Sequence, residues 1–266
     1  MDRKYFFFDI DATLTDDATH KIVPSAEWTL HELERNGHFV SIATGRAHYK
    51  TVSFTDPIGI RNIVCCGGAC IVRDGVTLVN TPLPIDQAHS LIRHAEEAGI
   101  GYLLMLDDSD KAYMKDFRFL EQAGRRTELT SYIYDPNLDP YQLTEIFKIY
   151  LAISREDEEK YDWVDMHGHL RMGTYLNYQY DAKKDGILRM MELLDAPVKD
   201  VVVFGDAVND LVMFDPMWTS IAMGNGMKEL KEKADYVAPA NTDDGIMRTC
   251  LHFGWITRNY YDVEEQ

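Results

Sequence analysis

The chain opens with a short apolar run that ends at two acidic residues. Tyr5–Phe8 are all aromatic, and Asp9 and Asp11 follow with one residue between them. A run this short and strand-forming predicts a β-strand that is buried on both faces, as in the middle of a parallel sheet. Because side chains alternate along a strand, the two carboxylates are expected on one side of the chain. Like charges this close repel unless a cation or a proton is shared, so the pair favours a ligand site over two solvated acids.

The pattern of buried strand and amphipathic helix then repeats. Each strand is expected to be followed by a helix that returns the chain for another parallel strand, with right-handed crossovers. Together these elements predict an α/β fold with a doubly wound, mainly parallel, Rossmann-like sheet. The expected strands are 39–43, 62–65, 201–204, 220–223 and 236–237, and the expected helices begin near Pro24, Ala47, Lys184 and Met227.

The alternation of buried strands and helices stops at two prolines, Pro82 and Pro84, which favour a hinge. After them, apolar residues at helical spacing run from Ala88 to Ala95, and Gly99 stops the helix. The remainder up to Asp181 mixes helical and strand-like segments. We therefore expect two parts, one from residues 1–81 and 182–266 and an inserted α+β domain from residues 82–181.

The composition narrows the classes of partner. The chain has 266 residues, of which 45% are hydrophobic, and its 27 basic and 44 acidic residues give a net charge of −17. This excess of acids disfavours nucleic acid and anionic membranes as partners. The sequence shows no signal-peptide pattern and no apolar run of membrane-spanning length. Its four cysteines suit reduced thiols, so a cytoplasmic protein is expected, and the oligomeric state is not readable.

Three predicted strands end in polar residues that should meet at one edge of the sheet. They are Asp9 with Asp11, then Thr44 and Gly45, then Asp206 with Asn209 and Asp210. At least four carboxylates would converge there, and hard oxygen ligands favour Mg²⁺ bound together with a substrate phosphate. A hydroxyl and an open amide at the second strand end suit a phosphate cradle, and Lys183 or Lys184 offers the balancing cation.

The order and spacing of these groups resemble the haloacid dehalogenase superfamily, in its Cof-type (subclass IIB) branch of phosphatases. The resemblance covers both ends of the chain, whereas the middle matches only in size and position. It implies that residues 1–81 and 182–266 form the catalytic core and that residues 82–181 form a cap that determines substrate specificity. Four motifs carry it: Asp9-Ile10-Asp11-Ala12-Thr13, Ala43-Thr44-Gly45-Arg46, Lys183-Lys184-Asp185-Gly186-Ile187 and Gly205-Asp206-Ala207-Val208-Asn209-Asp210.

The resemblance implies a Mg²⁺-dependent phosphatase that hydrolyses a small phosphorylated metabolite, with sugar phosphates the leading class. Asp9 would be the nucleophile that forms an aspartyl-phosphate, and Asp11 the general acid and base. Thr44, Gly45, Lys183 and Asn209 would hold the transferring oxygens. Mg²⁺ would be bound by Asp9, the main-chain carbonyl of Asp11, and Asp206. Asp210 would contact these ligands or act on the ion through water.

Two departures from the usual motifs and several less specific candidates complete the expectations. Ala12 and Ala207 stand where glycine is common, and Ala12 would be strained if that turn needs a positive φ. Arg46 could contact phosphate or only anchor a helix.

Two other functions stay open: a phosphosugar mutase or phosphotransferase of the same superfamily, and a non-catalytic switch that binds a phosphorylated ligand. Candidate substrate residues in the cap are Arg171, Tyr175, Asn177 and Tyr178.

Overall fold

The computed structural model describes residues 2–154, 156–163, 169–171 and 173–262, the segment 169–171 by its backbone only. The chain forms two compact units. Among the described residues, the first unit comprises segments 2–46, 50–79 and 182–262, and the second comprises 47–49 and those within 80–181. The divisions at 79/80 and 181/182 lie near the expected hinge, while the short segment 47–49 joins the second unit.

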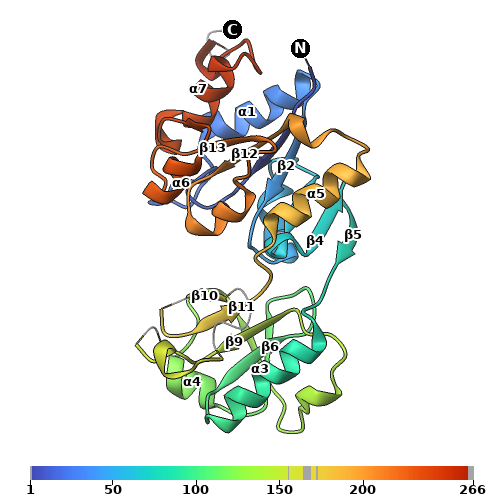
Figure 1. Cartoon of the computed structure of the whole chain (residues 1–266), viewed down its shortest axis with the longest axis vertical. Helices are drawn as coiled ribbons and strands as arrows, with labels where there is room; N and C mark the ends of the chain where they lie inside the picture. Colours follow the sequence, from blue (N-terminus) through green and yellow to red (C-terminus); the bar gives the residue numbers. More distant parts are fainter. Residues whose placement is uncertain (1, 155, 164–168, 172, 263–266) are drawn as a thin grey trace. The chain divides into compact units, whose positions relative to one another are not determined.

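The first unit is built on an eight-stranded sheet with the order β14-β13-β12-β1-β2-β3-β4-β5 (Figure 1). The strands from β14 to β3 are parallel, and β4 runs antiparallel to β3. This arrangement agrees with the predicted doubly wound, mainly parallel sheet. The strands are β1 (Tyr5–Phe8), β2 (Phe39–Ala43), β3 (Ile63–Cys65), β4 (Cys70–Arg73), β5 (Val76–Asn80), β12 (Val201–Gly205), β13 (Thr219–Ala222) and β14 (Tyr236–Val237).

Alternation along β1 explains why this sheet is covered on both faces. Phe6 and Phe8 pack into one core with α1 and α7, whereas Phe7 packs into the other core with α5 and α6. All three side chains are fully buried, as expected for a central strand. The helices of this unit are α1 (Pro24–Arg35), α2 (His48–Thr55), α5 (Lys183–Leu193), α6 (Lys228–Lys233) and α7 (Gly245–His252), with 3-10 turns η1 (Cys66–Gly68), η5 (Val198–Asp200), η6 (Val208–Met213), η7 (Asn241–Asp243) and η8 (Tyr260–Asp262).

The second unit is an α+β structure around a six-stranded sheet with the order β10-β11-β9-β6-β7-β8. Its strands pair antiparallel except β7 with β8, which run parallel. Helix α3 buries Ala88, Leu91, Ile92 and Ala95 against one face of the sheet, as its spacing predicts. The elements are α3 (Ile85–Glu97), β6 (Tyr102–Met105), β7 (Lys111–Met114), α4 (Arg118–Ala123), β8 (Ser131–Tyr134), η2 (Pro140–Gln142), β9 (Lys148–Leu151), η3 (Glu158–Lys160), β10 (His169–Arg171) and β11 (Leu176–Tyr178).

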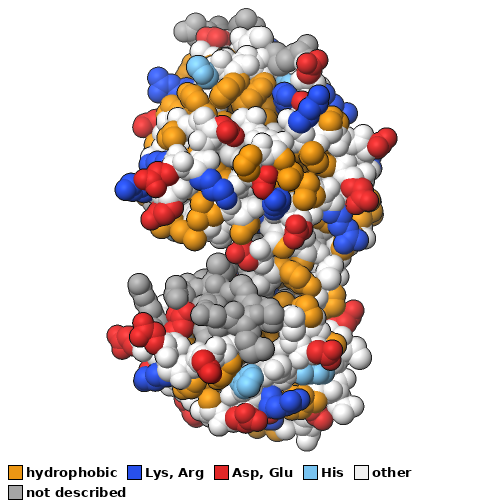
Figure 2. Space-filling view, viewed as in Figure 1, with side chains coloured by type: hydrophobic (Ala, Val, Ile, Leu, Met, Phe, Trp, Pro, Cys, Tyr) orange, Lys and Arg blue, Asp and Glu red, His pale blue; other side chains and the backbone are white. Residues whose placement is uncertain are grey.

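The surface reflects the acidic composition without forming a field of one sign. On the face drawn in Figure 2, the basic side chains of the described residues lie among acidic ones over both units. Along the described part of the chain, each helix is too short or too polar to cross a bilayer.

Candidate active site

The carboxyl ends of three neighbouring parallel strands bring the predicted polar residues together. Asp9 follows β1, Thr44 follows β2, and Asp206 follows β12. The Asp9 amide still donates to the Phe204 carbonyl at 3.0 Å, so the backbone beside Asp9 is fixed by the neighbouring strand. The site therefore lies at the sheet edge where open α/β folds bind their ligands.

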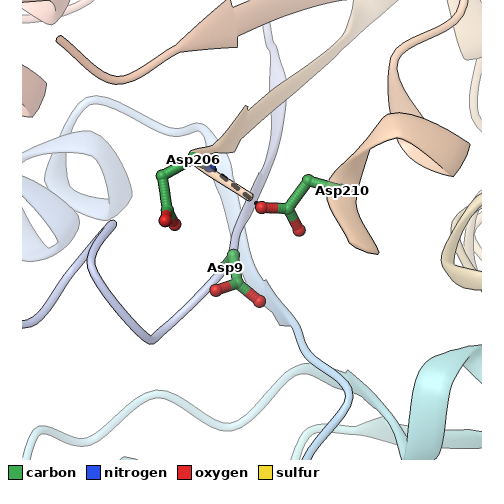
Figure 3. Close-up of side chains that lie close together, drawn as sticks. All are labelled: Asp9, Asp206 and Asp210. Carbon is green, nitrogen blue, oxygen red and sulfur yellow. Dashed lines mark hydrogen bonds between the residues drawn. The ribbon is translucent and has the colours of Figure 1, made fainter. Parts of the chain in front are cut away.

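Three carboxylates gather at this edge (Figure 3). Asp9, Asp206 and Asp210 are buried, and one oxygen from each lies within 4.8 Å of the others. The Asp210 carboxylate also accepts hydrogen bonds from the amides of Asp206 (2.9 Å) and Ala207 (3.1 Å), so the turn after β12 fixes its orientation. The hydroxyl of Thr13 donates to Asp206 at 2.8 Å. Thr13 was not among the predicted site residues, although its place two residues after Asp11 is the signal that could have indicated it.

Lys183 supplies the cation of the cluster. Its ammonium lies 2.7 Å from Asp9 Oδ1 and 2.6 Å from Asp210 Oδ1, and its side chain is 1% exposed. Lys183 begins α5, and the amide of the preceding Ala182 donates to the carbonyl of Gly67 at 2.7 Å. Lys184, the alternative cation, instead pairs with Asp215 at 2.6 Å.

One ammonium does not balance three buried carboxylates, and the pKa values reflect this. Burial, with the neighbouring carboxylates, raises the pKa of Asp9 above its ordinary value despite the opposing effect of Lys183. Burial, followed by the charge of Asp210, raises the pKa of Asp206 to about 7. For Lys183, burial opposes the charged form, but Asp210 and Asp9 outweigh it and raise its pKa. The cluster therefore keeps an excess of negative charge that a further cation would offset.

The donor set fits a hard divalent cation. All three acids offer carboxylate oxygens at mutual distances that one ion can bridge, and their excess negative charge disfavours the cluster without a cation. These residues could thus hold a divalent metal.

Asp11 lies apart from this cluster, contrary to the expected alternation. Its side chain is 62% exposed and forms a forked ion pair with Arg46, in which Arg46 Nε lies 3.0 Å from Asp11 Oδ2. The strand ends at Phe8, and the chain turns so that the amides of Leu14 and Thr15 both donate to the Ile10 carbonyl. Period-two geometry does not apply across such a turn. Among the described residues, three side-chain carboxylates therefore converge where at least four were expected. Arg46 contacts the carboxylate of Asp11.

The remaining predicted core residues surround the strand ends. Thr44 is buried and its hydroxyl accepts a hydrogen bond from the Arg46 amide at 3.2 Å, while Gly45 is half-buried at the bend after β2. Asn209 is half-buried in η6, one residue before Asp210.

Ala12 adopts the left-handed conformation, with φ 58°. Its carbonyl accepts a hydrogen bond from Asn225 Nδ2 at 2.8 Å, which fixes this conformation. Ala207, in contrast, has φ −117° and ψ 170°, an extended conformation that any residue adopts. The two departures from glycine thus have different consequences for the backbone.

The cap candidates divide between the two faces of the second sheet. Tyr178 is packed in the apolar core under α3, and its contact with substrate stays a prediction. Tyr175 and Asn177 alternate with it and are buried on the opposite side. Arg171 ends β10, and its side chain lies outside the described part of the structure.

Buried acids with one lysine at the carboxyl ends of parallel strands are typical of sites that transfer phosphoryl groups with a metal. Comparison with known proteins agrees with this class. A family model described as haloacid dehalogenase-like hydrolase matches residues 6–249. The chain belongs to this family, and the expectation of a phosphatase, a phosphoric monoester hydrolase of the family, is confirmed at that level.

Individual relatives cover nearly the whole chain. A Bacillus subtilis protein named "Putative phosphatase YkrA" is 33% identical over 263 residues, which is 96% of this chain and 99% of that protein. A crystal structure of a hypothetical protein from Geobacillus kaustophilus HTA426 has a TM-score of 0.81 and 28% identity, and the match covers 96% of this chain and all of that one. The HAD subclass IIB sugar phosphatase BT4131 shares the fold, with a TM-score of 0.75 and 21% identity over 95% of this chain and 100% of that chain.

Proposed function

We propose that the protein is a Mg²⁺-dependent phosphatase that hydrolyses a small phosphorylated metabolite through an aspartyl-phosphate on Asp9. The observation that carries this proposal is the buried contact of Asp9 with Lys183, 2.7 Å apart, inside a cluster with two further acids. The end of β1 and the Lys183 ammonium hold the Asp9 carboxylate in place, so this carboxylate can attack phosphorus without first reorganising.

Asp9, Asp206 and the main-chain carbonyl of Asp11 would hold the ion. Asp210 would orient the turn after β12 that carries Asp206. When bound, Mg²⁺ supplies positive charge that offsets the negative charge of the phosphate oxygens. Lys183 supplies the same kind of stabilisation from the protein. The Thr44 hydroxyl, the Gly45 amide and the Asn209 side chain would donate hydrogen bonds to the transferring oxygens.

The chemical steps belong to two aspartates. An Asp9 oxygen attacks phosphorus while the bond to the leaving oxygen breaks, and Asp11 gives its proton to that oxygen. Asp11 then takes a proton from water, whose oxygen attacks the phosphorus of the aspartyl-phosphate and releases Asp9. To do so, Asp11 must leave the ion pair with Arg46, and its exposure leaves the side chain free to turn.

We further propose that the second unit is the cap that recognises the rest of the substrate. Sugar phosphates are the first substrate class to test, because the protein named as a sugar phosphatase shares this fold. The alternatives of a mutase and of a non-catalytic switch differ in product: an isomerised phosphosugar for the first, and a stable phosphorylated Asp9 for the second.

The decisive experiment measures inorganic phosphate released from a panel of phosphorylated metabolites, with Mg²⁺ and with a chelator. Asp9→Asn is expected to lower kcat by about 10³-fold or more, because an amide does not form the phosphoryl ester. Asp185→Asn is a matched control, since Asp185 is exposed on α5. Substantial phosphate release by folded Asp9→Asn would remove Asp9 from its role, and indifference to the chelator would remove the metal.

A further inference from the structure

The loop that follows β1 is held by a second loop, which the catalytic proposal does not use. This β13 loop, residues 223–227, comes directly after β13. Nδ2 of Asn225 donates to the main-chain carbonyl of Ala12 at 2.8 Å. The amide of Met227 donates to the carbonyl of Asp206 at 2.7 Å. One short segment therefore contacts both of the strand ends that carry the proposed metal ligands.

The β13 loop lies directly against the backbone of Asp206. A Cβ at Gly226 would lie 2.9 Å from the Asp206 carbonyl oxygen and 3.0 Å from its Cα atom, so a side chain there would push the two segments apart. The Gly226 amide also closes the loop, because it donates to the Met223 carbonyl at 2.9 Å. This close packing fixes where Asn225 stands relative to Asp206.

Hydrogen bonds fix the Asn225 side chain at both of its polar atoms. Oδ1 accepts from the main-chain amide of Asn241 at 2.9 Å, while Nδ2 donates to the Ala12 carbonyl. An amide side chain has one acceptor oxygen and one donor nitrogen, so only this orientation satisfies both partners. Asn241 is itself buried, and its Nδ2 donates to the carbonyl of Thr15 at 2.7 Å. The two asparagines thus hold the segment 12–15 at each end.

Ala12 is the residue at which this support matters. Its φ of 58° is left-handed, which costs free energy for a residue that has a Cβ. Rotation about the N–Cα bond of Ala12 sets the direction of the preceding peptide group, and that group carries the Asp11 carbonyl. The next residue, Thr13, donates its hydroxyl to Asp206 at 2.8 Å. Relaxation of Ala12 would therefore move a proposed main-chain ligand and a group that orients a side-chain ligand.

We propose that Asn225 is a positioning residue for the divalent metal, and that it holds Ala12 in the left-handed conformation so that the Asp11 carbonyl and Asp206 keep the arrangement that binds the ion. The inference rests on the proposed function, because it concerns the metal of the same site. Asn225 acts on the ion through the main chain of the neighbouring loop.

The test measures Mg²⁺ binding to the metal-free protein by titration calorimetry. Asn225→Ala removes the donor to the Ala12 carbonyl, and we expect it to raise the Kd for Mg²⁺ by about 10- to 100-fold, as changes to groups that orient metal ligands do. Adding Ala12→Gly to this variant should recover much of the loss, because glycine adopts the left-handed conformation without strain. Ala12→Gly alone should leave the Kd almost unchanged.

Asn62 offers a matched control in the same unit. Its Nδ2 donates to the Val40 carbonyl at 3.2 Å, and its Oδ1 accepts from the Asp74 amide at 3.0 Å. Asn62 directly precedes β3, so it lies at the amino end of a parallel strand, whereas the clustered acids follow carboxyl ends. Asn62→Ala loses the same two kinds of hydrogen bond. It should destabilise the metal-free protein to chemical denaturation, as Asn225→Ala does, but leave the Kd for Mg²⁺ unchanged.

Each outcome supports or overturns the positioning role. An unchanged Kd in folded Asn225→Ala, an equal rise in Asn62→Ala, or a double variant that binds Mg²⁺ no better than Asn225→Ala overturns it. If Asn225→Ala does not fold, Asn225→Asp decides, because a carboxylate still accepts from the Asn241 amide but cannot donate to Ala12. The added negative charge alone would lower the Kd, so a raised Kd supports the role and any other value overturns it.

Failure of the proposed function gives a different result. Mg²⁺ binding by the intact protein without phosphate release, from the metabolite panel or from p-nitrophenyl phosphate, overturns the phosphatase and leaves the positioning role to be decided by the Kd values. Absence of Mg²⁺ binding by the intact protein overturns the metal and the positioning role together.

Discussion

Single residues in this protein show how one backbone angle changes the meaning of a substitution. Ala12 and Ala207 both stand where glycine is common in the corresponding motifs, and strain is expected at Ala12 only if its turn needs a positive φ. The structure separates them, because Ala12 has φ 58° and Ala207 has φ −117°. A left-handed residue with a Cβ is strained by about 1–2 kcal/mol, whereas an extended one is not.

Glycine should therefore act in opposite directions at these two positions. Ala12→Gly relieves the strain but adds freedom to the unfolded chain, so we expect a gain in the free energy of unfolding of up to about 1 kcal/mol. Ala207→Gly has only the second effect and should lose about 0.5–1 kcal/mol. Chemical denaturation of the three proteins measures this. Equal losses for both variants would show that Ala12 is not strained.

Residue-scale prediction from sequence succeeds where the chain stays regular. Asp9 lies next to a strand whose residues the apolar pattern identifies, and its side chain is buried. Asp11 is only two residues further on, but the turn at Ile10 places it against Arg46 instead. The pattern of apolar residues carries no information about where a side chain points after the strand has ended.

At the scale of elements, the same contrast appears. The pattern predicts β2 as residues 39–43, which is where the strand lies, because a central parallel strand is apolar throughout. The hairpin of β4 and β5 is absent from the sequence-based expectations. Its signal is the dipeptide Asp74-Gly75, whose two positive φ values, 52° and 79°, are typical of a two-residue hairpin turn.

Helix α5 carries a more demanding constraint. It begins at Lys183, and its Gly186 lies against the backbone of η1. A Cβ at Gly186 would lie 2.5 Å from Val64 Cγ1 and 2.8 Å from the Cα atom of Gly68. The absence of a side chain at Gly186 thus lets α5 approach closely enough for Lys183 to reach Asp9.

Gly186→Ala is consequently expected to destabilise the protein, although alanine is the better helix former by about 1 kcal/mol. Overpacking against backbone should cost about 1–3 kcal/mol, and the displacement of Lys183 should lower kcat as well. Thermal unfolding and phosphate release measure the two effects. Arg189→Ala, at an exposed position of the same helix, should change stability by less than about 0.5 kcal/mol. A more stable, fully active Gly186→Ala would refute the close-packing argument.

At the scale of the whole molecule, the site depends on residues that are far apart in sequence. Asp9 comes from the beginning of the chain, whereas Lys183, Asp206 and Asp210 come from the part that follows the second unit. Strand order brings the aspartates together, as the repeating α/β pattern predicts for Asp9, Asp206 and Asp210, whereas the choice of Lys183 over Lys184 depends on the family resemblance.

The acid cluster also couples the stability of the first unit to pH. The pKa of Asp206 is about 7 in the folded protein, above its unfolded value of 3.8, and that of Asp9 is raised as well. Both groups therefore bind protons more strongly in the folded state. Their contribution to stability is fully present below pH 3.8 and is lost as the pH rises through about 7 for Asp206 and about 8 for Asp9. At higher pH, where Asp9 and Asp206 have lost these protons, a bound divalent cation should supply the missing positive charge.

We therefore expect Mg²⁺ to stabilise the protein more at pH 8 than at pH 5.5, where protons compete for the same oxygens. At a hundredfold excess over Kd the gain at pH 8 is about 2.7 kcal/mol, and Asp206→Asn should lose most of it. Hydrogen exchange can locate the effect, with added protection in β1, β12 and α5 but not in β6 and β9 of the second unit, which serve as an internal control. Equal gains at both pH values, or protection spread over both units, would mean that the ion binds elsewhere, because Asp9 and Asp206, whose pKa values are raised, lie in the acid cluster at the ends of β1 and β12.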